Sequence, residues 1–259
     1  MLTTSVIQRL AGHRFADVRS FDEVDSTNTY VLAQARAGAA DGIVAVADRQ
    51  TAGRGRLGRS WVAPAGGSLL FSVLVRPGDL AVERAHLLTA AMALAGATAC
   101  QKVAGVAPQL KWPNDLLVGE RKLAGILAEA DVSPGPPPAL SAVVIGMGLN
   151  VAWHGEAPSE VAGIAVALDG VSHVAVDRAD LLVEVLVDYE RRLADLDAVA
   201  ADFRAGCATL GRPVRVQLAG EILIGTAIDI TGEGHLVVDP GHGLGLPRRV
   251  AAGDVVHLR

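Results

Sequence analysis

The first hundred residues alternate between amphipathic and continuously apolar stretches, and this pattern predicts their secondary structure. Polar residues 25–28 precede an amphipathic stretch, as expected for a capped helix. Apolar runs at 43–47 and 68–75 are typical of buried strands. The long apolar stretch at 81–103 predicts a buried helix, with Asp79 as its cap.

The middle of the chain is richer in strands. Extended segments are predicted at 109–112, 116–118, 123–130 and 142–151. A tight turn at 119–121 joins two of them into a hairpin, and the prolines of 133–138 predict a surface loop. Apolar spacing over 181–189 predicts a helix, and another ends near Cys207. Because hairpins exclude a simple alternation of strands and helices, we expect an α+β fold with a mixed, mainly antiparallel sheet and flanking helices.

The pattern changes again after Leu210, where glycine turns separate short strands at 214–218, 222–230, 235–238 and 249–258. This texture is typical of a small β-barrel. We therefore expect two domains, one of residues 1–209 and a small C-terminal barrel of residues 210–259.

Composition and charge narrow the class of protein. The chain has 259 residues, of which 51% are hydrophobic and only 3% aromatic, so we expect an aliphatic core and no extensive disorder. No charged leader precedes a long apolar run, and the most apolar stretch, 85–100, is too short and polar to span a bilayer. Two cysteines and seven scattered histidines predict neither a disulfide framework nor a structural metal. We expect a soluble, cytoplasmic protein.

The net charge of −5 conceals one basic segment. Residues 49–59 contain four arginines and no acid, and the rest of the chain holds 19 basic and 28 acidic residues, or −9. This balance disfavours a general nucleic-acid-binding protein. The segment also matches a dinucleotide fingerprint at Gly53, Gly55 and Gly58, but residues 61–67 are poor helix formers, as the fingerprint does not allow. Arginine forks between flexible glycines instead predict a loop that binds carboxylate or phosphate.

Three further segments carry candidate site residues. Two of them place polar side chains at the ends of strands, and the third has glycines within a strand. Residues 111–115 place a cation, an amide and a carboxylate close together. Lys122 stands beside the small residues Ala124 and Gly125, which leave room for a ligand, and its charge suits a developing anion. The glycines of 146–150 indicate close approach of a ligand or of another backbone.

Together these segments resemble biotin–protein ligases. The matching motifs are Asp25–Asn28, Gln50–Arg59, Lys111–Asp115, Arg121–Leu127 and Gly146–Asn150, in the family's order and spacing. The resemblance implies a catalytic domain like those of class II aminoacyl-tRNA synthetases and a C-terminal barrel of Src-homology-3 type. It also implies that ATP, with Mg²⁺, activates biotin to biotinyl-5′-AMP. A specific lysine of a biotin carboxyl carrier protein then receives the biotin.

The resemblance also implies roles for individual residues. Lys122, Arg54 and Arg56 would be catalytic. Biotin would contact Ser26, Thr27, Asn28, Gln50, Gly53, Arg54, Gly55, Arg56, Lys122 and Gly125. ATP would contact Arg56, Arg59, Lys111, Asn114, Asp115 and Asn150, with its Mg²⁺ near Asp115. We expect Trp61 to pack against the arginine loop, outside the site.

Other functions remain open at the level of sequence. A lipoate- or octanoate-transferring relative of the same fold is the nearest, although hydroxyl and amide side chains suit a ureido ring better than an acyl chain. A non-catalytic biotin- or carrier-binding protein is disfavoured by the cations Lys122, Arg54 and Arg56. Only about 24 residues precede the first motif, so we expect no DNA-binding domain and no DNA binding.

Overall fold

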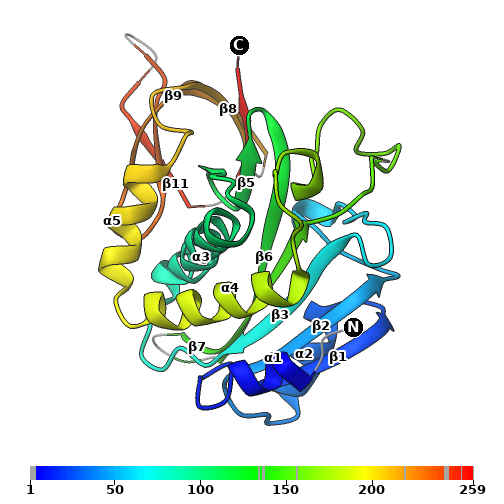
Figure 1. Ribbon diagram of the computed structural model, residues 1–259. Coiled ribbons are helices and arrows are strands. Elements are labelled where there is room, and N and C mark those ends of the chain that lie inside the picture. The colour runs from blue at the N-terminus through cyan, green and yellow to red at the C-terminus, as the bar shows by residue number, and fades with distance from the viewer. Residues whose placement is uncertain are drawn as a thin grey trace.

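A seven-stranded mixed sheet organises residues 17–150 of the chain (Figure 1). The structure is a computed structural model and describes residues 4–133, 135, 138–155, 157–218, 220–241, 245–251 and 253–258. The sheet order is β1-β2-β3-β7-β6-β5-β4. Its strands are β1 (Asp17–Val24), β2 (Ile43–Gln50), β3 (Ser68–Val75), β4 (Gln109–Lys111), β5 (Asp115–Val118), β6 (Arg121–Ser133) and β7 (Ala139–Asn150). Only β1 and β2 pair in parallel, which confirms a mainly antiparallel sheet.

The two faces of this sheet are covered unequally, because successive residues of a strand point to opposite faces. One face packs under α3 (His86–Ala104) and α4 (Arg178–Leu193), with Phe71, Ile145 and Met147 in the main core. The other face packs under α2 (Thr27–Arg36) through a smaller cluster that includes Leu74, Val144 and Ala45. Beyond this cluster the second face carries the polar and glycine residues described below.

The long apolar helix forms as expected in type, but its predicted cap is wrong. A short 3₁₀ turn, Val82–Arg84, separates Asp79 from α3, so Ala85 precedes the helix and makes no side-chain cap. Segment Val82–Ala104 is long and apolar enough to cross a membrane by length and composition, yet 67% of its most apolar window is buried inside the protein. That burial is typical of a core helix.

The remaining elements surround this core. Helix α1 (Thr4–Arg9) packs on α4, and α5 (Leu196–Gly206) packs on α3. Short 3₁₀ turns occur at Arg56–Gly58 and Leu168–Gly170. Within the predicted proline loop, residues 134, 136 and 137 lie outside the described residues. Both cysteines are buried and free.

The C-terminal strands form a second, antiparallel sheet in the order β11-β10-β9-β8-β12. They are β8 (Pro213–Gln217), β9 (Ile222–Ile230), β10 (Leu236–Asp239), β11 (Arg248–Val250) and β12 (Asp254–His257). The buried residues of this sheet, including Val214 and Leu236, join the same apolar cluster as α3. The Trp112 indole donates to the Gly234 carbonyl across the junction at 3.0 Å. The two sheets therefore lie against each other, and closure of the second into a Src-homology-3-like barrel stays a prediction.

Candidate active site

The polar and glycine-bearing part of the second face forms the floor of an open pocket, whose empty space, open solvent included, is about 780 Å³. The register places Gly125 of β6 opposite Gly148 of β7, and Gly146 opposite Ser72 of β3. Gly146 and Gly148 must be glycines because neighbouring side chains approach them closely. A Cβ on Gly146 would lie 2.1 Å from Asn28 Oδ1, and one on Gly148 would lie 2.5 Å from the Trp61 ring. The absence of side chains on the floor thus admits two large neighbours and leaves room for a ligand.

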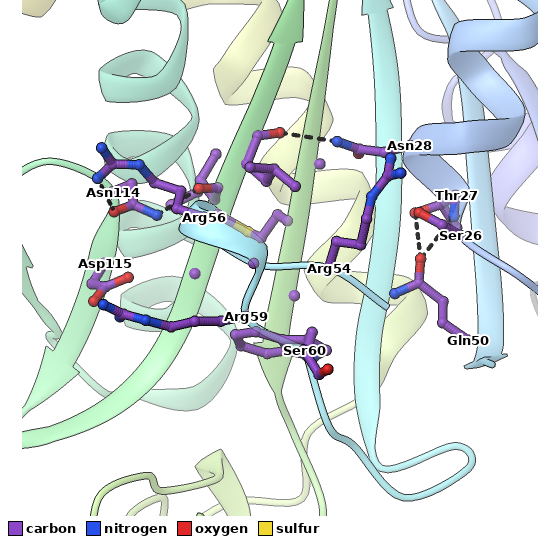
Figure 2. A pocket seen from close by; sticks show the side chains of 18 of the residues that line it. Ser26, Thr27, Asn28, Gln50, Arg54, Arg56, Arg59, Ser60, Asn114 and Asp115 are labelled. Atoms are coloured by element: carbon purple, nitrogen blue, oxygen red, sulfur yellow. Dashed lines mark hydrogen bonds between the residues drawn. The ribbon is translucent and has the colours of Figure 1, made fainter. Parts of the chain in front are cut away.

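One side of the pocket is a set of uncharged side chains, most of them buried, that we call the neutral wall. Ser26 caps α2, its Oγ accepting from the Thr29 amide at 3.4 Å, and this cap sets the direction of the helix start. Thr27 donates from its amide and its hydroxyl to Gln50 Oε1, at 2.7 and 3.0 Å (Figure 2). The neutral wall consists of Ser26, Thr27, Asn28 and Gln50, which line the pocket, together with the buried Ser72, which hydrogen-bonds to Thr27 and Asn28.

The hydrogen bonds within the neutral wall run from strand to helix. Ser72 Oγ lies 2.7 Å from Thr27 Oγ1 and 2.6 Å from Asn28 Oδ1, and its single proton can serve one of them at a time. Asn28 Nδ2 donates to the Leu127 carbonyl at 3.2 Å and to Glu129 Oε2 at 2.8 Å. The wall is therefore held in one arrangement by its own side chains.

The arginine loop, which carries Arg54, Arg56 and Arg59, follows β2 and crosses the pocket. Backbone contacts within it close a narrow turn: Gly55 donates to the Arg59 carbonyl at 2.7 Å, and Trp61 donates to the Gly53 carbonyl at 2.9 Å. At its tip Leu57 has φ 56°, in the left-handed region, and its side chain is exposed. A branched residue in that conformation carries strain.

The three arginines of the loop reach three different parts of the fold. Arg54 NH2 lies 2.9 and 3.0 Å from the two carboxylate oxygens of Glu129 on β6. Arg56 donates to Asn114 Oδ1 at 3.2 Å, at the start of the β5 hairpin (Figure 2). Arg59 forms an ion pair with Asp254 of β12, in the second sheet.

Lys122 lies over Gly125, where its Nζ is 2.6 Å from Asp115 Oδ1 and 5.6 Å from the centroid of the Trp61 ring. Its backbone is fixed by the segment after β7, since its amide donates to Ile164 and its carbonyl accepts from Val166 at 2.9 Å. Its side chain is 35% exposed, so the ammonium group is open to the pocket. We call this end of the pocket the charged rim; it consists of Arg56, Arg59, Asp115, Lys122 and Asp254.

Burial governs the electrostatics of the charged rim. Burial lowers the pKa of the Arg56 guanidinium, an effect opposed by Asp254 and Asp115, and the group remains charged at neutral pH. Behind it, burial lowers the pKa of His86 to about 4, with Arg56 adding to the shift. His86 is therefore neutral at pH 7. The rim can exchange its ion pairs for contacts with carboxylate or phosphate oxygens.

The structure brings most of the predicted site residues into this one pocket. They are Ser26, Thr27, Asn28, Gln50, Arg54, Gly55, Arg56, Arg59, Asn114, Asp115, Lys122 and Gly125. Gly53, Lys111 and Asn150 are not among the lining residues. Asn150 is buried, within 3.2 Å of Ser68 Oγ and of the Val166 carbonyl.

Sequence reasoning missed several lining residues, and it placed Trp61 outside the site. The Trp61 ring stands in the pocket wall between Gly148 and Lys122, because the two floor glycines leave space for an indole. Alternation along β6 could have indicated Leu127, which shares a face with Gly125, whereas Phe71, Ile126 and Met147 alternate onto the core face of the sheet and carry no such signal. No local sequence pattern could identify Asp254, because it lies 195 positions along the chain from its partner Arg59. The missed residues are Ser60, Trp61, Phe71, Ile126, Leu127, Met147 and Asp254.

The chain is similar to known proteins over most of its length. The sequence profile of the biotin/lipoate A/B protein ligase family matches residues 20–150, and that of the biotin protein ligase C terminal domain matches residues 209–258. A biotin–[acetyl-CoA-carboxylase] ligase of Mycobacterium tuberculosis is 41% identical, over 96% of this chain and 91% of that protein. One of Paracoccus denitrificans is 36% identical, over 73% and 80%. The solved biotin protein ligase of Aquifex aeolicus, in complex with biotin and ATP, aligns with a TM-score of 0.78 and 26% identity, covering 95% of this chain and 100% of that one.

Proposed function

The chain belongs to the biotin/lipoate A/B protein ligase family, and we propose that it is an ATP-dependent biotin–protein ligase. It activates biotin to biotinyl-5′-AMP and transfers biotin to a specific lysine of a biotin carboxyl carrier domain. One observation carries this proposal: a single pocket joins a neutral hydrogen-bonding wall to a rim of three cations. Biotin has the matching polarity, with an uncharged ureido ring at one end and a carboxylate at the other.

In the first step, a biotin carboxylate oxygen attacks the α-phosphorus of ATP and pyrophosphate leaves. Like charges must be neutralised before this attack, and Lys122, with Arg56 beside it, supplies positive charge at the reacting end. The neutral wall would hold the ureido ring through Thr27 and Gln50. Orientation at one end and charge at the other bring the reacting atoms together.

In the second step, the neutral amine of the carrier lysine attacks the carbonyl carbon of the mixed anhydride and forms the amide C–N bond. AMP leaves with the electron pair of the broken C–O bond, and the nitrogen loses a proton to solvent. Lys122 stabilises the charge on the departing phosphate. The arginine loop, through Arg54, Gly55 and Arg56, would shield the anhydride from water. Arg59 and Asn114 would contact the nucleotide.

Magnesium would enter with ATP and neutralise charge on its phosphates. The residues present fit such an ion, because Asp115 offers carboxylate oxygens inside the pocket and its partner there is the cation Lys122.

We further propose two domains, 1–209 and 210–259, and a cytoplasmic location. The free state of both cysteines agrees with a reducing compartment.

The test is reconstitution of both steps. We expect the protein, given ATP, Mg²⁺, biotin and a biotin carboxyl carrier domain, to release pyrophosphate and to label a single carrier lysine. A carrier domain with that lysine changed to arginine should stay unlabelled. Equal transfer of lipoate or octanoate would favour the acyl-transferring relative, and biotin binding without pyrophosphate release would favour a non-catalytic binder.

A further inference from the structure

Glu129 is a carboxylate that the activation chemistry does not require, yet it stands at the edge of the pocket. It lies on β6 two residues beyond Leu127 and therefore points to the same face of the sheet as Gly125. Its side chain is 29% exposed. An acid beside a site for anionic substrates opposes their binding, unless its charge is committed elsewhere.

Both oxygens of Glu129 are committed. Arg54 NH2 contacts them at 2.9 and 3.0 Å, and Asn28 Nδ2 donates to Oε2 at 2.8 Å. One partner belongs to the arginine loop and the other to the neutral wall. Figure 2 shows the Arg54 side chain extending from the loop toward Asn28. Glu129 thus joins two parts of the site that come from different elements.

The contact continues through the wall as a chain of polar side chains. Asn28 Oδ1 lies 2.6 Å from Ser72 Oγ, which lies 2.7 Å from Thr27 Oγ1, which in turn donates to Gln50. Any displacement of Asn28 therefore changes the position of Glu129, and with it the partner that Arg54 needs. The chain runs in the order Arg54, Glu129, Asn28, Ser72, Thr27 and Gln50.

We propose that Glu129 is a positioning residue that holds the arginine loop against the neutral wall while the activated intermediate is bound. The inference rests on the proposed function. The neutral wall holds Asn28, Asn28 holds Glu129, and Glu129 holds Arg54 and the loop closed over biotinyl-5′-AMP. The wall that receives the head group thereby also slows escape of the anhydride at the other end.

Glu129→Gln tests this by removing the charge while keeping the side chain's size. We expect the first-turnover rate of pyrophosphate release to change little. Dissociation of preformed biotinyl-5′-AMP should accelerate about tenfold, as for loss of a charge-assisted hydrogen bond that is partly exposed. Labelling of serum albumin, which has no carrier domain, should rise in parallel.

The chain offers a closely matched control. Asp131 lies two residues further along β6, is 28% exposed, and pairs with Arg36 of α2 rather than with the loop. We expect Asp131→Asn to release the intermediate at the wild-type rate. Any general effect of removing an acid from this strand would appear in both variants.

A double-mutant cycle separates positioning from general destabilisation. If Glu129 acts through Arg54, then Arg54→Gln combined with Glu129→Gln should release the intermediate no faster than the faster single variant. Multiplying effects, or a wild-type release rate for Glu129→Gln, would overturn the proposal while leaving the proposed function in place. A wild-type protein that makes no biotinyl-5′-AMP would overturn both.

Discussion

The neutral wall and the charged rim occupy opposite ends of one pocket, and they are built differently. The wall comes from the first turn of α2 and from β2 and β3, and its groups bond mainly to one another. The rim gathers side chains from a loop, a hairpin and the second sheet, held as ion pairs such as Arg59 with Asp254. A ligand can use the wall as it stands, whereas anionic substrates must displace partners at the rim. Recognition therefore depends on a fixed arrangement, and chemistry depends on exchangeable charges.

The largest effect on activity is expected from Lys122→Ala, at the rim. Loss of a cation that is aimed at the reacting phosphate should slow pyrophosphate release by about a thousandfold, the upper range for removing one such group. Biotin binding should weaken much less, because the neutral wall is untouched. Single-turnover pyrophosphate release and biotin titration check the two ends separately. Lys102→Ala, which removes an exposed lysine of α3 that pairs with Glu184 and does not line the pocket, is the matched lysine control, and equal losses in both variants would contradict the assignment.

The corresponding substitution at the wall is Gly146→Ala. The added Cβ would lie 2.1 Å from Asn28 Oδ1 and must displace it. A shift of about 1 Å in a positioning group can cost about a hundredfold, so we expect KM for biotin to rise by that order. KM for ATP should change much less. Gly232→Ala, where a Cβ meets nothing within 4 Å, should behave as wild type. An unchanged KM for biotin would show that the wall is less rigid than its bonds indicate.

The wall was more predictable from sequence than the rim, for physical reasons. Ser26 and Thr27 are local to one helix start, and capping chemistry identifies such residues without tertiary information. The basic loop was recognisable from charge alone. The partners that decide where its arginines point, Glu129 and Asp254, come from strands remote in the chain. Trp61 was misplaced because its position depends on two glycines in neighbouring strands, whose register a single sequence does not fix.

Acid should disturb the rim end before the wall, because His86 lies behind Arg56. Its pKa is about 4 in the folded protein and 6.5 ordinarily, so the unfolded chain takes up the proton first as pH falls. The stability from neutral His86 is complete above pH 6.5 and is lost progressively toward pH 4, by about 2 kcal/mol at pH 5. Urea unfolding at pH 7 and pH 5 measures this. His86→Leu should reduce the difference, and the exposed His173→Gln should not.

Asn150→Ala tests whether a predicted nucleotide contact belongs to the rim or to the core. Asn150 is 2% exposed and lies within hydrogen-bond distance of Ser68 and the Val166 carbonyl, so its loss should cost about 1–3 kcal/mol of unfolding free energy. Thermal unfolding and KM for ATP should be measured on the same protein. A raised KM for ATP at unchanged Tm would instead support the nucleotide role that the motif implies.

The smallest effect is expected where the second sheet contacts the rim. Asp254 pairs with Arg59 and competes with phosphate for it, and its negative charge also repels ATP. Asp254→Asn should therefore lower KM for ATP by about threefold, the range of a partly exposed ion pair, and added salt should reduce the difference. KM for biotin should not move, since the neutral wall has no contact with Asp254. Asp229→Asn is the control, because Asp229 lies on β9 of the same sheet, away from the pocket, and pairs with Arg204 of α5. A raised KM for ATP would mean that Asp254 positions Arg59 for the nucleotide, so that the rim, like the wall, is prearranged.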